Sequence, residues 1–200
     1  GDVLIPSNFS INGGTFTGTG SRLKSIGGAI IFGVETISFT GSIDDVALNA
    51  GCCFGAITLN ADLTVNNSLR ITDVQQVNGK VIAIGGNLAS NDADLAGTTV
   101  FRLNGTGDQT LTGIGRVHNL DIAKPSGDVL IPSNFTVSGG AFTGAGSRLR
   151  STGGAIIFGA ETISFTGSID DVNILAASNQ NLTLNADLTV NNNLTVTQVF

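Results

Sequence analysis

Methionine, tryptophan and tyrosine are absent from this chain of 200 residues, which has only 3 prolines and 1 histidine. Residues that favour helices are also scarce, since only 2 of the 15 acidic residues are glutamate and only 3 of the 9 basic residues are lysine. Helical folds are therefore close to excluded. A single histidine also excludes a metal centre built from several histidines.

Charge is sparse as well. Charged residues make up 12% of the chain, and the net charge is −6. Binding to nucleic acid needs clustered lysines and arginines, whereas the nine basic residues here are scattered, so we expect no nucleic-acid partner. The longest apolar runs, such as residues 29–32, are far shorter than the roughly 20 residues of a membrane helix, and we expect no membrane insertion.

The residues that are abundant favour strands and turns. Hydrophobic residues make up 41% of the chain, enough to bury a core, and there are 28 glycines and 11 phenylalanines. Short runs alternate apolar and polar residues, as in Thr162–Thr166 and Leu188–Val190, and are separated by turn residues such as Gly139–Gly140. This pattern is typical of strands with one buried face.

The chain contains a long internal repeat. Residues 1–46 recur at 127–172 with eight differences in 46 positions, an offset of 126. The polar-to-apolar exchanges, such as Ile26 to Thr152 and Thr15 to Ala141, predict side chains that face solvent. We divide the chain into a first repeat unit, 1–126, and a truncated second unit, 127–200, stacked continuously on the first. Because the second copy breaks off at Phe200, we expect a piece of a longer protein.

The length of the repeat favours a solenoid. The 126 residues divide into six coils of 21, a plausible coil for a parallel β-helix. About nine or ten coils, spaced by about 4.8 Å, would give a rod about 45 Å long. We therefore predict an all-β fold, a β-solenoid of about 21 residues per coil. The alternative is a set of tandem β-sandwich repeats.

Candidate catalytic residues are few. His118 is the one histidine, and no nucleophile motif accompanies it, so we interpret it as a surface residue. The carboxylate pairs Asp44–Asp45 and Asp170–Asp171 are candidates for a general acid and a general base. Adjacent strand residues point to opposite faces, however, so one aspartate of each pair should point inward or lie at a corner. We expect no catalytic residues, and the sequence does not identify a ligand-binding residue.

Other candidate sites are equally sparse. Calcium is a second hypothesis for Asp44–Asp45 and for Asn91–Asp94, although neither has the spacing of a known calcium loop, and we expect no metal site and no cofactor. Gly105–Gly107 lacks the third glycine and the helix of a nucleotide-binding motif. Cys52 and Cys53 are adjacent, and we interpret them as two free thiols, because an ordinary disulfide needs more widely separated Cα atoms.

Three segments carry a resemblance to a known class of protein. They are Leu103–Gly113, Asn119–Gly127 and Leu184–Val190. They resemble the repeats of large bacterial surface and secreted proteins, the filamentous-haemagglutinin-like and related β-strand-repeat adhesins. The resemblance implies a right-handed parallel β-helix that is exported to the cell surface or beyond, and that acts as a stalk or fibre.

We therefore expect a non-enzymatic structural segment of an extracellular bacterial adhesin or surface filament. Its partners would be further copies of itself or adjacent repeats of the parent chain, with host or surface glycans as further candidates. End-to-end assembly is part of this hypothesis, since coil edges can pair with another copy. The alternative is a β-helix that binds or cleaves carbohydrate, which would need aromatic platforms and clustered carboxylates.

Overall fold

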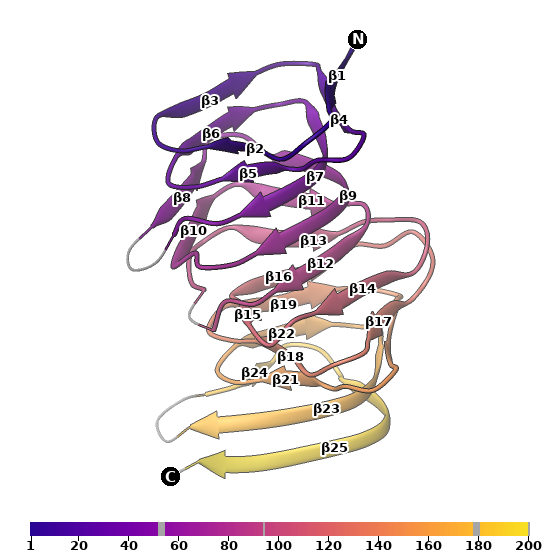
Figure 1. The fold of residues 1–200 in the computed structure, drawn as a ribbon. Helices are drawn as coiled ribbons and strands as arrows, with labels where there is room; N and C mark the ends of the chain where they lie inside the picture. Colours follow the sequence, from indigo (N-terminus) through magenta and orange to yellow (C-terminus); the bar gives the residue numbers. More distant parts are fainter. Residues whose placement is uncertain (52–54, 94, 178–180, 200) are drawn as a thin grey trace.

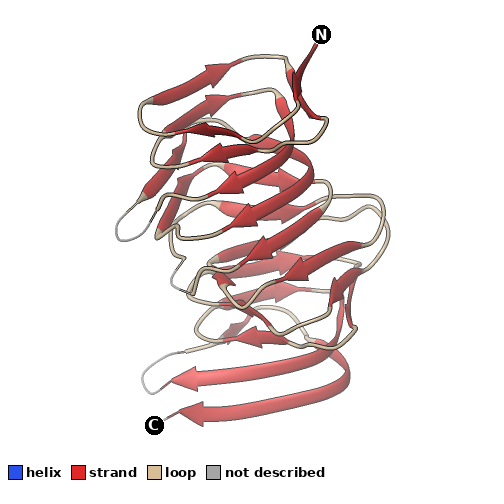
Figure 2. Ribbon diagram, viewed as in Figure 1, coloured by secondary structure: helices blue, strands red, loops and turns tan. Residues whose placement is uncertain are grey.

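The computed structural model describes residues 1–51, 55–93, 95–177 and 181–199, and these form a stack of parallel coils. Figure 1 shows the stack running from the N-terminus at one end to the C-terminus at the other, and Figure 2 shows strands joined by loops. All pairings between the named strands are parallel, which confirms the solenoid and rules out the sandwich of antiparallel strands.

Each coil contributes strands to three faces. Face A consists of β1 (Asp2–Ile5), β4 (Arg22–Ser25), the first part of β7 (Ser42–Leu48), the first part of β9 (Leu63–Ile71), β11 (Val81–Ile84), β13 (Val100–Leu103), β16 (Asn119–Ile122), β19 (Ala141–Gly144), β22 (Thr162–Phe165) and β24 (Thr183–Leu184).

Face B follows face A along each coil. It consists of β2 (Phe9–Ile11), β5 (Ile30–Phe32), the second parts of β7 and β9, β12 (Asn87–Ser90), β14 (Gln109–Thr112), β17 (Val129–Ile131), β20 (Arg148–Ser151), the first part of β23 (Ser168–Ala177) and the first part of β25 (Thr189–Val199).

Face C closes the coil. It begins with the four-stranded ladder of β3 (Thr15–Gly18), β6 (Thr36–Phe39), β8 (Ala56–Leu59) and β10 (Gln76–Gly79). A single bridge joins Gln76 to Ala96. The ladder then resumes with β15 (Arg116–Val117), β18 (Phe135–Val137), β21 (Ile156–Phe158) and the second parts of β23 and β25.

The core is built from side chains that stack on their equivalents in the next coil. In β6, Ile37 and Phe39 are buried while Thr36 and Ser38 are partly exposed, so the alternation places one apolar row inside. One ladder on face A runs through Val3, Leu23, Ile43, Val65, Ile84, Leu103 and Ile122. Together the buried apolar side chains form one core cluster that runs from Ile5 to Val172.

Glycine marks the corners where coils approach closely. A Cβ at Gly28 would lie 2.0 Å from the carbonyl carbon of Ser7 in the coil before it, and Gly154 stands in the same relation to Ser133, at 2.1 Å. A larger residue would push the two coils apart at this corner. Packing therefore requires glycine at positions 28 and 154 of the repeat.

The second copy of the repeat is rotated by one face relative to the first. β17, the equivalent of β1, lies on face B in the ladder that begins with β2. β19, the equivalent of β3, lies on face A in the ladder that begins with β1.

The 126-residue repeat therefore spans six and a third coils of about 20 residues, not the six coils of 21 that we predicted. All three faces accept strands of similar length with an apolar inner row, so nothing in the packing forces the copies into phase. The predicted exposure of the exchanged side chains is confirmed at Ile26, Thr152 and Thr15, all of which face solvent.

Candidate functional site

Asp44 lies at the bend of β7, where the strand passes from face A to face B and its register with β9 shifts. It is 2% exposed. Its carboxylate accepts hydrogen bonds from Arg22 Nε at 2.8 Å and Nη2 at 2.9 Å, and from Asn66 Nδ2 at 2.8 Å. The hydrogen bonds from Arg22 hold the pKa of Asp44 below its ordinary value. These hydrogen bonds join three successive coils. A carboxylate that stays charged and whose oxygens already accept hydrogen bonds is a poor general base.

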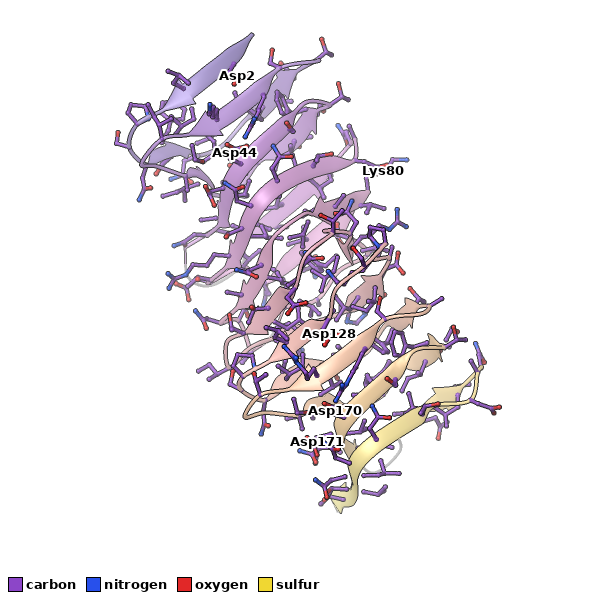
Figure 3. All side chains as sticks on the ribbon, turned by 90° about the vertical axis from the view of Figure 1, so that its right-hand side faces the viewer. Asp2, Asp44, Lys80, Asp128, Asp170 and Asp171 are labelled. Atoms are coloured by element: carbon purple, nitrogen blue, oxygen red, sulfur yellow. The ribbon has the colours of Figure 1, made fainter. Side chains whose placement is uncertain are left out.

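The same cluster recurs in the second copy, on face B and its bend toward face C. Asp170 accepts hydrogen bonds from Arg148 Nε at 3.0 Å and Nη2 at 2.9 Å, and from Asn191 Nδ2 at 2.9 Å. Burial raises the pKa of Asp170, but the bonds from Arg148 and Asn191 outweigh it, so the pKa is lowered. Figure 3 shows Asp44 and Asp170 in different parts of the stack. The two clusters are thus repeats of one corner.

The second aspartate of each pair points outward. Asp45 accepts a hydrogen bond from Asn67 Nδ2 at 3.2 Å, and Asp171 accepts one from Asn193 Nδ2 at 2.7 Å. The prediction that one aspartate of each pair lies inward or at a corner is confirmed. The two carboxylates of a pair do not converge on a common point of reaction.

The calcium hypothesis gains no support from the geometry. Across residues 1–51, 55–93, 95–177 and 181–199, no three His, Cys, Asp or Glu side chains form a group that could hold a metal ion. Asp92, from the second calcium candidate, accepts a hydrogen bond from the Val74 N–H at 2.5 Å. Asp94, Cys52 and Cys53 lie outside the described residues.

Two buried glutamates are features that the sequence did not reveal. Glu35 and Glu161 occupy the same position in the two copies, at the turn before β6 and β22, and are 5% and 2% exposed. Glu35 accepts a hydrogen bond from the Gly33 N–H at 3.1 Å, and Glu161 accepts one from the Gly159 N–H at 3.0 Å. Each carboxyl has one buried oxygen without a partner among the described residues. Burial raises the pKa of each to about 7, against the opposing effect of the backbone N–H bonds.

The junction between the copies contains a buried lysine. Lys124 is 8% exposed, and its ammonium group donates to Gly105 O at 3.0 Å, Gly107 O at 2.7 Å and Gln109 Oε1 at 3.0 Å. Gln109 is itself wholly buried and donates to Ile84 O at 2.9 Å. The three N–H donors of the ammonium group thus have three acceptors. These hydrogen bonds connect the 104–108 corner to the following coil, which contains Lys124. Burial lowers the pKa of Lys124, partly offset by Asp108 and Asp128.

His118 is half-buried beside the Gly139–Gly140 turn of the next coil. A Cβ at Gly139 would lie 2.7 Å from His118 Cε1, so the imidazole packs directly against this glycine. The position is that of a packing residue at a corner. The sequence interpretation made His118 a surface residue, and the structure places it half-buried at this corner.

A shallow groove repeats on the two copies below the Gly-Gly corner. In the first copy it has a volume of about 390 Å³ and includes Asn8 and Asp45; in the second it has about 460 Å³ and includes Asn134 and Asp171. None of the residues that line either groove is aromatic. The stacking platforms of a typical carbohydrate site are therefore missing from both.

The two ends of the stack carry exposed apolar surface. Val3, Leu4 and Phe9 are 50%, 55% and 59% exposed in the first coil. In the last coil, Leu194 and Val196 are 54% and 66% exposed, beside a hollow of about 600 Å³. These side chains belong to inner rows that an adjoining coil covers elsewhere in the stack.

The described residues contain no helix with the length and hydropathy that crossing a membrane requires. The chain matches no protein-family model, no curated protein and no solved structure.

Proposed function

We propose that this chain is a structural repeat segment, a stalk or fibre element, of an extracellular bacterial adhesin or surface filament. The observation that carries the proposal is the unbroken stack. The strands of the second copy pair directly with those of the first on all three faces, through β14 with β17, β15 with β18, and β16 with β19. In such a stack, stability comes from contacts between neighbouring coils, so copies can be added without a new fold.

The chemistry of the side chains supports a mechanical role. The charged groups of Asp44, Asp170 and Lys124 are hydrogen-bonded to neighbouring coils and resist their separation. The resemblance of segments such as Leu103–Gly113 to adhesin repeats supports the extracellular location.

The length of the rod is the direct test. Chains carrying one, two and three full copies of residues 1–126 should differ in length by about 30 Å per copy, the product of six and a third coils and a spacing of about 4.8 Å. Small-angle scattering and electron microscopy measure this. Compact particles whose maximum dimension does not grow with copy number would contradict the proposal.

Antibody labelling of intact bacterial cells that produce the parent protein tests the location, and labelling only after permeabilisation would contradict it.

The carbohydrate alternative has its own test. A glycan array and a polysaccharide-cleavage assay on the full chain should give no signal if the role is mechanical. Binding that is lost on Asp171→Ala, in the groove of the second copy, would favour the alternative instead.

A further inference from the structure

Two neighbouring coils in the middle of the stack are joined unevenly around their circumference. The first of them contains β11 and β12, and the second contains β13, β14 and β15 (Figure 1). On face A, β11 pairs with β13 through four residues, whereas on face B, β12 pairs with β14 through two. On face C, the described residues form no strand between β10 and β15. Strand pairing therefore holds these two coils along face A more than along the other two faces.

Other coils of the stack are joined evenly. The coil of β16, β17 and β18 pairs with the next coil through three residues on each face. The first coil pairs with the second through four, three and four residues. The uneven step lies within residues 81–117, outside the 46 residues that recur. An array of complete 1–126 copies would therefore contain this step once in every copy.

Buried polar side chains cross the uneven step where the ladders are short. Ser90 is wholly buried, and its hydroxyl donates to Arg116 O at 2.9 Å. Gln109 is also wholly buried, and its amide group donates to Ile84 O at 2.9 Å and to Gly86 O. Side chains thus make contacts between these coils that backbone ladders make elsewhere in the stack.

The polar character of this step lowers the cost of opening it. Water can replace Ser90 and Gln109 as the hydrogen-bond partner of the carbonyl groups. Thr99, just before β13, has a buried hydroxyl without a partner among the described residues, and hydration would supply one. Few strand pairs on two faces and a polar contact surface together make this step less stable than steps joined on all three faces.

We propose that this step is a hinge, at which the two coils rotate apart about face A and faces B and C open. The four-residue pairing of β11 with β13 is the axis, and the hydrogen bonds of Ser90 and Gln109 hold the hinge closed. This inference deepens the proposed function and rests on it, because it gives the stalk one defined place in each copy at which to bend.

Hydrogen exchange measured by mass spectrometry on the 200-residue chain tests the hinge. Residues 109–117 form faces B and C of the coil that follows the hinge, and residues 129–137 form the same faces one coil later. Protection factors in 109–117 should be about tenfold lower than those in 129–137, because local opening exposes the first set alone. Ser90→Ala removes one hydrogen bond across the hinge and should lower the protection of 109–117 further.

A disulfide across the hinge gives a second test. Ala89 and Thr112 are paired partners on face B, and a strand spacing of about 4.8 Å suits a disulfide. Ala89→Cys with Thr112→Cys, in a chain with serine at positions 52 and 53, should raise the protection of 109–117 to the level of 129–137, and a reductant should reverse the effect. Thr136→Cys with Ile157→Cys is the matched control across an evenly joined step, and it should leave 109–117 unchanged.

Equal protection of 109–117 and 129–137 in the parent chain would overturn the hinge, and this measurement needs no variant. A disulfide between positions 89 and 112 that changes exchange no more than the control disulfide would also overturn it. Failure of the hinge together with rods that lengthen by copy number would leave the proposed function standing. Rods that fail to lengthen would remove the proposed function itself.

Discussion

Arg148 and Asp170 form a two-pronged ion pair between neighbouring coils, with N···O distances of 3.0 and 2.9 Å. Arg22 and Asp44 form the same pair one face away, at 2.8 and 2.9 Å. Identical residues thus make identical contacts on two different faces of the solenoid. The corner is set by its own residues and does not depend on which face it occupies.

Asp44→Asn should lower the free energy of unfolding by about 1–3 kcal/mol, since it removes a buried, charged acceptor from Arg22 and Asn66. Asp45→Asn is the control and should have little effect, because Asp45 lies on the outer face. Since the pKa of Asp44 is lowered on folding, its contribution is present above about 3.8 and is lost as the pH falls through the lower folded value. Urea denaturation at pH 7 compares the variants, and equal losses for both would argue against this account.

The buried carboxyls of Glu35 and Glu161 predict a second, opposite dependence on pH. Their pKa is raised from 4.5 to about 7 on folding, so the folded state favours the protonated form. Their contribution to stability is complete below pH 4.5 and is lost as the pH rises through about 7. Denaturation midpoints should therefore fall between pH 5 and pH 8.

Glu35→Gln combined with Glu161→Gln should abolish most of this fall, because glutamine resembles the protonated carboxyl and still accepts the backbone N–H bond. We expect the double variant to be more stable than the parent at pH 8 by roughly 1–3 kcal/mol, after allowance for partial solvation of the carboxyls. A parent chain whose midpoint rises between pH 5 and pH 8 would contradict the assignment.

Lys124→Met should destabilise the junction between the copies. The substitution leaves Gly105 O, Gly107 O and Gln109 Oε1 without their donor, at a cost of about 1–3 kcal/mol. Hydrogen exchange should accelerate in residues 104–109 and 123–128, while the first three coils keep their protection. Lys80→Met, at an exposed position, should change neither region.

Phe135→Ala should cost about 3–5 kcal/mol, because Phe135 is fully buried under the coil before it. Phe9→Ala, at the equivalent position, should cost less than about 1 kcal/mol in dilute solution, since Phe9 is 59% exposed. Denaturation of dilute protein measures both. Similar losses for the two variants would mean that the first coil is covered even in the monomer.

The fold could be predicted because the sequence alternates apolar and polar residues within each strand and repeats itself along the chain. Ile163 and Phe165, separated by Ser164, predicted a strand with one buried face, and both are buried. Gly139–Gly140 predicted a turn, and it lies between the end of β18 and the start of β19. The rotation between the copies could not be predicted, because the three faces take similar strands and the length of 126 also fits six whole coils.

The polar interior was harder to predict. Glu35 lies in a turn just after Gly33, and Lys124 precedes a proline, which are contexts typical of exposed loops. Lys124 donates to groups 15 to 19 residues earlier in the chain, and such partners leave no local pattern. Glu35 has a local partner in the Gly33 N–H, but the coils that bury its carboxyl cannot be read from the neighbouring residues. The only hint in the sequence was that glutamate and lysine are rare in this chain. A rare residue type does not show which groups a side chain contacts.

The one-face rotation has a consequence for any longer array of these copies. Each copy would turn its outer side chains by 120° about the axis, so that three copies, roughly 19 coils, present the same residues in every radial direction. A flat surface beside such an array would then contact the same group of outer side chains once in every three copies. Material that surrounds the array would contact that group equally from all sides.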